Sequence, residues 1–199
     1  MRLRVRLISD MATEAERLEM GDFILKSEAR KDKLGRLKVY PLPKADGGGT
    51  FEVAGINDRY HPKAATHLKN LIDSNRHSQA ESFAKKYLVE YTDVVKNWTE
   101  LAPLEAFLRD AAFNRGPKGA LRILQIALGI ADDGKFGPVT KTTLAKAAKN
   151  AASLLDNLRS ARETYEIRVA PPVGARAKFW AGLQNRWNNA LEFSKKFIV

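Results

Sequence analysis

Prolines set the lengths that the helices of this chain can have. Apolar patterns with helical spacing begin at or near four of them, Pro62, Pro103, Pro117 and Pro138. Proline is tolerated at the start of a helix because the first N–H groups there have no intrahelical partner, whereas a proline further inside breaks the helix. The sequence therefore predicts a mainly α fold built from several helices of moderate length.

The first predicted helix has a glutamate near its end. Thr13 and Glu16 match the capping-box pattern, and the apolar spacing that follows predicts a helix over residues 13–31. Glu28 lies three and four residues after two apolar side chains, so it shares their buried face. Burial raises the pKa of a carboxyl group and favours a proton-donating role. The alternative is a glutamate at the rim of the core that pairs with Arg30 or a lysine.

A change of pattern to strict alternation predicts a β-hairpin at about residues 36–56. Pro41 cannot donate to a neighbouring strand, so the first strand belongs at the edge of a small sheet. Between the two runs stand three consecutive glycines, residues 47–49, flanked by Asp46 and Thr50. Glycine permits positive φ angles and close backbone approach, so this turn can direct the acid and the hydroxyl toward another element. The alternative is an ordinary loose turn.

Charge is the strongest signal in the composition. The 199 residues include 34 Lys and Arg against 23 Asp and Glu, a formal net charge of +11, so the protein should be drawn to polyanions. Nucleic acid and the anionic cell envelope are both candidates, but no predicted helix gathers the basic residues on one face, so no nucleic-acid partner is expected. An apolar content of 44% excludes a disordered chain.

Several classes of site are not expected from the residue types present. The chain has no cysteine, which excludes disulfides and thiolate chemistry, and its three histidines match no zinc spacing. The turn containing Asp132 and Asp133 lacks the alternating acids of a calcium-binding loop. We expect no metal and no cofactor. No apolar run is long enough for a membrane span, and residues 1–10 do not resemble a secretion signal and add little to the expected fold.

Two stretches carry a family resemblance. "ILKSEA" followed by "DGGGTFEVAGI" is similar to the muramidases of glycoside hydrolase family 108. "LRDAAFNRGPKGALRILQIALGIADDGKFGPVTKTTL" resembles the predicted peptidoglycan-binding domain that accompanies that family, and "FWAGLQNRWNNA" is similar to its closing motif, with Leu183 where a Trp is more usual. The family typically follows its glutamate with Gly-Gly-Tyr, whereas Ala29, Arg30 and Lys31 stand here.

The resemblance implies a lysozyme-like α+β fold in two parts. Residues 1–100 would form the catalytic part and residues 101–199 a helical peptidoglycan-binding part, packed as one compact unit and active as a monomer. Glu28 would be the general acid that cleaves the glycan β-1,4 linkage, with Asp46 and Thr50 positioning water or stabilising charge. Glu52 lies on the same strand face as Thr50 and is the rival for the second carboxylate. Candidates for substrate binding are Tyr40, Asn57, Tyr60 and Asn114.

These features predict a peptidoglycan hydrolase of the phage or prophage endolysin type. It would be made in the bacterial cytoplasm and would act in the periplasm or cell wall after holin-type or other signal-less export. Two alternatives stay open. One is a peptidoglycan-binding module that lacks catalysis, which the altered residues after Glu28 favour, and the other is a basic nucleic-acid-binding protein.

Overall fold

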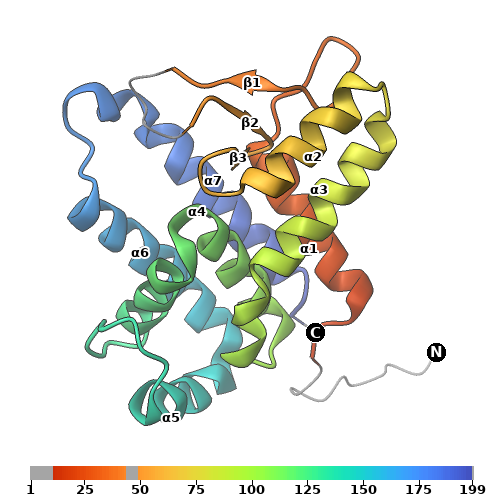
Figure 1. Ribbon diagram of the computed structural model, residues 1–199. Helices are drawn as coiled ribbons and strands as arrows, with labels where there is room; N and C mark the ends of the chain where they lie inside the picture. The colour runs from red at the N-terminus through yellow and green to blue at the C-terminus, as the bar shows by residue number, and fades with distance from the viewer. Residues whose placement is uncertain (1–10, 44–48, 199) are drawn as a thin grey trace. The chain divides into compact units, whose positions relative to one another are not determined.

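The computed structural model describes residues 11–43 and 49–198 (Figure 1). Helices dominate, and the predicted mainly α fold is confirmed. The elements in chain order are α1 (Glu14–Glu28), β1 (Tyr40–Pro41), β2 (Phe51–Val53), β3 (Ile56–Asn57), α2 (Pro62–Asp73), α3 (His77–Tyr91), the 3₁₀ helix η2 (Asp93–Asn97), α4 (Ala102–Ala127), α5 (Pro138–Ala147), η3 (Ala148–Asn150), α6 (Ala151–Val169), η4 (Gly174–Phe179) and α7 (Trp180–Lys195).

Contacts between residues divide the chain into two compact units. The sheet unit is Gly21–Glu90, and the helical unit combines Met1–Met20 with Tyr91–Val199. Residues 11–20 thus group with the carboxyl-terminal helices. The division into a catalytic part at residues 1–100 and a binding part at residues 101–199 stays a prediction.

The sheet unit contains a three-stranded antiparallel sheet in the order β1-β2-β3. Its edge strand β1 contains Pro41, as the sequence predicts, and β3 adds a strand to the expected hairpin. Helix α2 packs against β2 and β3. Leu68 of α2 and Val53 and Ile56 of the sheet are fully buried, so the core of this unit lies between the helix and the sheet.

The helical unit is built on mutual packing of α4, α6 and α7 (Figure 1). Fully buried side chains in these three helices include Phe107, Leu158 and Trp187. Helix α4 is interrupted at Gly116, where φ is 70° and ψ is 163°, and Pro117 begins the second half. The two helical patterns that the sequence predicts on either side of this Gly-Pro pair are therefore both present, with a break between them.

A buried ionic cluster joins the three long helices of the helical unit. Asp110 of α4 is fully buried and accepts hydrogen bonds from Arg162 of α6 at 2.5 Å and from Arg186 of α7 at 2.8 Å. Burial raises the pKa of the Asp110 carboxyl, but the two guanidinium groups outweigh it and lower the pKa to about 2. Asp110 is therefore ionised and fixes the spacing of α4, α6 and α7.

Gln125 organises the turn that precedes α5. Its amide nitrogen donates to Asp133 Oδ1 at 2.8 Å, to the Lys135 carbonyl at 3.0 Å and to Thr140 Oγ1 at 3.1 Å. Its amide oxygen accepts from the Gly134 N–H at 2.8 Å. The interpretation of Gln125 as a buried partner of backbone groups is confirmed.

Replacement of this amide should destabilise the helical unit. We expect Gln125→Leu to lower the free energy of unfolding by about 1–3 kcal/mol, because the buried Thr140 hydroxyl and the backbone groups of Gly134 and Lys135 lose their partner. Urea unfolding followed by circular dichroism measures the change. Gln184→Leu is the matched control, since Gln184 is half-exposed and its amide nitrogen donates to Glu163 alone among the described residues. Equal losses in the two variants would contradict the role assigned to Gln125.

Candidate active site

Glu28 is the last residue of α1 and is half-buried. The apolar side chains that precede it on the same face, Ile24 and Leu25, are each 1% exposed. The capping box at the other end of the helix is present, with the Thr13 N–H donating to Glu16 Oε2 at 2.7 Å and the Glu16 N–H donating to Thr13 Oγ1 at 3.2 Å. The helix thus ends with a half-buried carboxylate, a position that both interpretations of Glu28 allow.

Glu52 lies at the centre of a row that crosses all three strands. It pairs with Tyr40 of β1 on one side and with Asn57 of β3 on the other. Directly opposite residues of antiparallel strands project from the same face of a sheet. The structure therefore brings together the rival carboxylate and two of the predicted substrate-binding residues.

Arg30 lies beside this row. Its Nε is 3.6 Å from Glu52 Oε1, and its guanidinium carbon is 3.7 Å from the centre of the Tyr40 ring. Burial raises the pKa of the Glu52 carboxyl, the charge of Arg30 opposes this, and the negative charge of Glu28 raises the pKa further. Glu28 and Glu52 are thus close enough to interact electrostatically.

Thr50 is held by a carboxylate that the sequence analysis missed. The Thr50 hydroxyl donates to Asp58 Oδ2 at 2.5 Å, and the Thr50 N–H donates to Asp58 Oδ1 at 2.8 Å. The hydrogen bond from the Thr50 side chain is the main reason why the pKa of Asp58 is lowered. An Asn-Asp pair at the end of a strand is a turn signal, and it was the available clue to Asp58.

Gly49 is required by this arrangement. Its φ is 114°, a conformation that L-residues with a side chain rarely adopt, and a Cβ atom at this position would collide with the Asp58 carboxylate. Gly49 is the one residue of the glycine turn that the structure describes. Asp46, the predicted second carboxylate, lies outside the described residues.

The other predicted residues have different surroundings. Asn57 Oδ1 accepts from the Tyr60 N–H at 2.9 Å, so this amide stabilises the turn after β3. The Tyr60 side chain is 66% exposed. Asn114 belongs to α4 of the helical unit, and its Oδ1 is buried with no hydrogen-bond partner among residues 11–43 and 49–198.

Neither a metal cluster nor a spanning helix is found in the described part of the chain. There, no three histidine, cysteine or acidic side chains are grouped so that they could hold a metal ion. None of the helices in those residues is long and apolar enough to cross a membrane.

A comparison with known protein families finds a match in the helical unit. Residues 119–188 match the family described as "Predicted Peptidoglycan domain". This match supports a peptidoglycan-related protein. It covers about a third of the chain, including Gln125, the turn it organises, Arg162 and Arg186. No curated protein matches the chain significantly.

The fold as a whole is similar to a solved structure, "Structure of Brucella abortus SagA". The TM-score is 0.62, and the likeness covers 93% of this chain and 97% of that chain. The sequences are 19% identical, so the likeness is one of fold. It extends over the sheet unit as well as the helical unit.

Proposed function

We propose that the chain is a peptidoglycan hydrolase of the muramidase type, with Glu28 as its general acid. The observation that carries this proposal is the pair of half-buried glutamates, Glu28 at the end of α1 and Glu52 on β2, whose charges interact. The match to a predicted peptidoglycan domain supports the class of substrate. The resemblance around "ILKSEA" supports the type of reaction.

Glycoside cleavage needs two groups on opposite faces of the sugar. An acid protonates the leaving glycosidic oxygen, and a carboxylate activates water or stabilises the oxocarbenium-like transition state. Glu28 would donate the proton to the glycosidic oxygen as the C–O bond breaks, water would add to the anomeric carbon, and the proton that this water loses would pass to a carboxylate of the site. Glu52 is the described candidate for the second carboxylate. Its raised pKa also suits a proton donor, so the two roles are tested side by side in the variants discussed below.

Residues around the pair support sugar binding. Tyr40 and Asn57 flank Glu52 on the same sheet face and offer an aromatic ring and an amide. The Thr50 hydroxyl hydrogen is donated to Asp58, so a water molecule at Thr50 would donate to the hydroxyl oxygen. We propose this oxygen as the group that positions the attacking water.

The cellular setting belongs to the same proposal. A net charge of +11 raises the rate of encounter with an anionic envelope and makes that encounter sensitive to salt. We propose an endolysin-like enzyme that acts as a monomer in the periplasm or cell wall, after holin-type or other signal-less export.

One observation favours a second candidate function. Arg30 stands where the family resemblance leads one to expect glycine, and its guanidinium lies between the Tyr40 ring and Glu52. The charge of Arg30 opposes the rise in the pKa of Glu52, and its side chain occupies space beside Glu52 and Tyr40. A module that binds peptidoglycan without cleaving it would have this property.

The products released from purified peptidoglycan distinguish the candidates. We expect the wild-type protein to release new reducing ends, which appear as muramitol after borohydride reduction and mass spectrometry, and we expect the rate to fall with added salt. Sedimentation of the protein with the same peptidoglycan measures binding separately. Binding without release would favour the non-cleaving module. If the protein neither binds peptidoglycan nor releases reducing ends from it, the peptidoglycan role is refuted. Binding to duplex DNA at moderate salt would instead favour the nucleic-acid alternative.

A further inference from the structure

The helical unit contains a cavity that takes no part in the proposed cleavage. It lies where η2, the segment that follows η2, and α5 with η3 come together, and its volume is about 490 Å³. Cavities that bind small ligands usually measure about 300–1,000 Å³. The cavity therefore has the size of a ligand site.

The floor of this cavity is apolar. The rings of Trp98 and Phe136 lie with their centres 6.4 Å apart at an angle of 31°, and Leu144 of α5 lines the cavity beside them. Trp98 is 8% exposed, so only a small part of its ring is open to a ligand. Such a floor suits small apolar groups such as methyls better than the flat face of a sugar ring.

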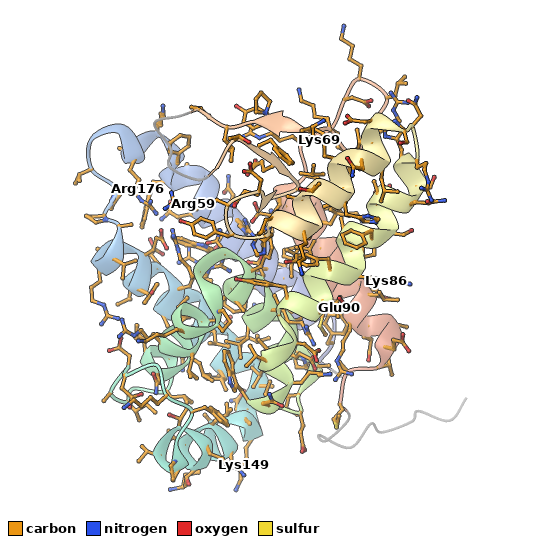
Figure 2. All side chains as sticks on the ribbon, in the orientation of Figure 1. Arg59, Lys69, Lys86, Glu90, Lys149 and Arg176 are labelled. Carbon is orange, nitrogen blue, oxygen red and sulfur yellow. The ribbon has the colours of Figure 1, made fainter. Side chains whose placement is uncertain are left out.

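The rim of the cavity is basic. It carries Lys96, Lys141 and Lys149 against a single acid, Glu100. Lys96 is paired with Asp93 at 2.6 Å, whereas Lys141 and Lys149 have no ion-pair partner in the part of the chain that the structure describes. Lys149 belongs to η3, directly after α5 (Figure 2). Two lysines are thus available for an anionic ligand.

A second hollow extends the site. Its volume is about 440 Å³, and it shares Trp98 and Phe136 with the first. Lys118 and Lys135 line it together with Asp133. An extended chain of a few residues, at about 3.3–3.6 Å per residue, would contact both hollows and lysines of each.

We propose that this cavity binds the peptide stem of peptidoglycan through its carboxylates. The proposal rests on peptidoglycan being the substrate, and it adds a contact to the peptide rather than to the glycan. A stem peptide offers alanyl methyls for the apolar floor and free carboxylates for Lys141 and Lys149. A glycan needs many hydrogen-bonding partners for its hydroxyl groups, and the floor of this cavity lacks them.

Titration of the full-length protein with a synthetic stem tetrapeptide tests the proposal. The probe is L-alanyl-γ-D-glutamyl-meso-diaminopimelyl-D-alanine, added to ¹⁵N-labelled protein at low salt. The chain has three tryptophans, so three indole N–H signals are expected, and Trp98→Phe identifies the signal at the cavity. We expect the Trp98 signal to shift during the titration while those of Trp180 and Trp187 do not.

Charge variants show whether the lysines make the contact. We expect Lys141→Met with Lys149→Met to weaken peptide binding about 5- to 20-fold, as the loss of two charge contacts in a half-open site implies. Lys146→Met is the matched control, since Lys146 is an exposed lysine of α5 that does not line the cavity. A probe with the free α-carboxylate of its glutamyl residue amidated should bind more weakly to the wild-type protein.

Three results would overturn the proposal. These are an unchanged Trp98 signal at millimolar peptide, an equal loss of binding in Lys146→Met, and a Trp98 shift caused by peptide-free glycan strands but not by the peptide. Cleavage of the same peptide-free strands is measured separately and reports on the proposed glycan-cleaving site of the sheet unit, not on this cavity. Loss of cleavage therefore refutes the proposed hydrolase, and loss of the peptide contact refutes only this site.

Discussion

Glu28→Gln should lower the release of muramic acid reducing ends by about 10²–10⁴-fold, the usual contribution of a general acid. The amide keeps the shape of the side chain, but its N–H groups are not acidic and cannot transfer a proton to the leaving oxygen. The measurement is the initial rate on purified peptidoglycan, compared with wild type at several pH values. An unchanged rate would assign the acid elsewhere.

Glu52→Gln is the comparison that separates the two glutamates. If Glu52 acts in its ionised form, wild-type activity should fall on the acid side at a pH above the ordinary range of a glutamate, because burial raises the pKa of Glu52. The variant should then lose most of its activity at all pH values. The two roles would be exchanged by a different result. Glu52→Gln would then lose more activity than Glu28→Gln, and its activity would no longer fall at high pH, because the group whose deprotonation causes that fall would be absent.

A titration of the Glu52 carboxyl provides a control that does not depend on turnover. The charge of Glu28 raises the pKa of Glu52, so Glu28→Gln should lower that pKa, whereas Arg30→Met should raise it. Carbon-13 chemical shifts of labelled glutamate followed through a pH titration measure both changes. No change in either variant would mean that the three side chains do not form one electrostatic cluster.

The second large effect is expected on stability. Asp110→Asn should lower the free energy of unfolding by about 3–5 kcal/mol, because it removes the carboxylate shared by Arg162 and Arg186 and leaves buried positive charge without a partner. Urea unfolding at neutral pH measures the loss. Asp156→Asn is the control, since Asp156 pairs with Lys195 at 3.2 Å on the surface and is 59% exposed. A surface pair contributes about 0–1 kcal/mol.

The loss in Asp110→Asn should depend on pH with a definite sign. The pKa of Asp110 is about 2 in the folded protein and close to 3.8 when the chain is unfolded. The stabilisation is therefore complete above pH 3.8 and is lost as the pH falls toward 2. The difference between wild type and variant should shrink over that interval. A difference that stays constant down to pH 2 would contradict an ionised Asp110.

Features fixed by short-range interactions could be predicted from the sequence. The capping box of Thr13 and Glu16, the edge position of β1 and the helical break at Gly116 each depend on residues a few positions apart or on one backbone property. The position of Glu28 at a helix end follows from the same kind of information. These features were predicted because local rules are sufficient for them.

Features fixed by long-range contacts could not be predicted from the sequence. Asp110 contacts Arg162 and Arg186, which lie 52 and 76 residues further along the chain, and no pattern in the sequence indicates this. The bond from Thr50 to Asp58 spans only eight residues, but it depends on the third strand, which the sequence analysis did not predict. The placement of Arg30 against Tyr40 and Glu52 likewise depends on how the sheet meets the end of α1.

At the break in α4, the residue type at position 116 is limited by the left-handed backbone conformation and not by the space for a side chain. At Gly116, φ is 70° and ψ is 163°, a region essentially reserved for glycine, yet apart from the adjoining residues of the helix no described atom lies within 4 Å of where the Cβ of an L-residue would stand. A residue of opposite chirality has mirror-image preferences and would occupy this conformation without strain. D-alanine introduced by chemical ligation would therefore adopt the backbone conformation of Gly116 without the strain that L-alanine would meet there, and it would reduce the freedom of the unfolded chain.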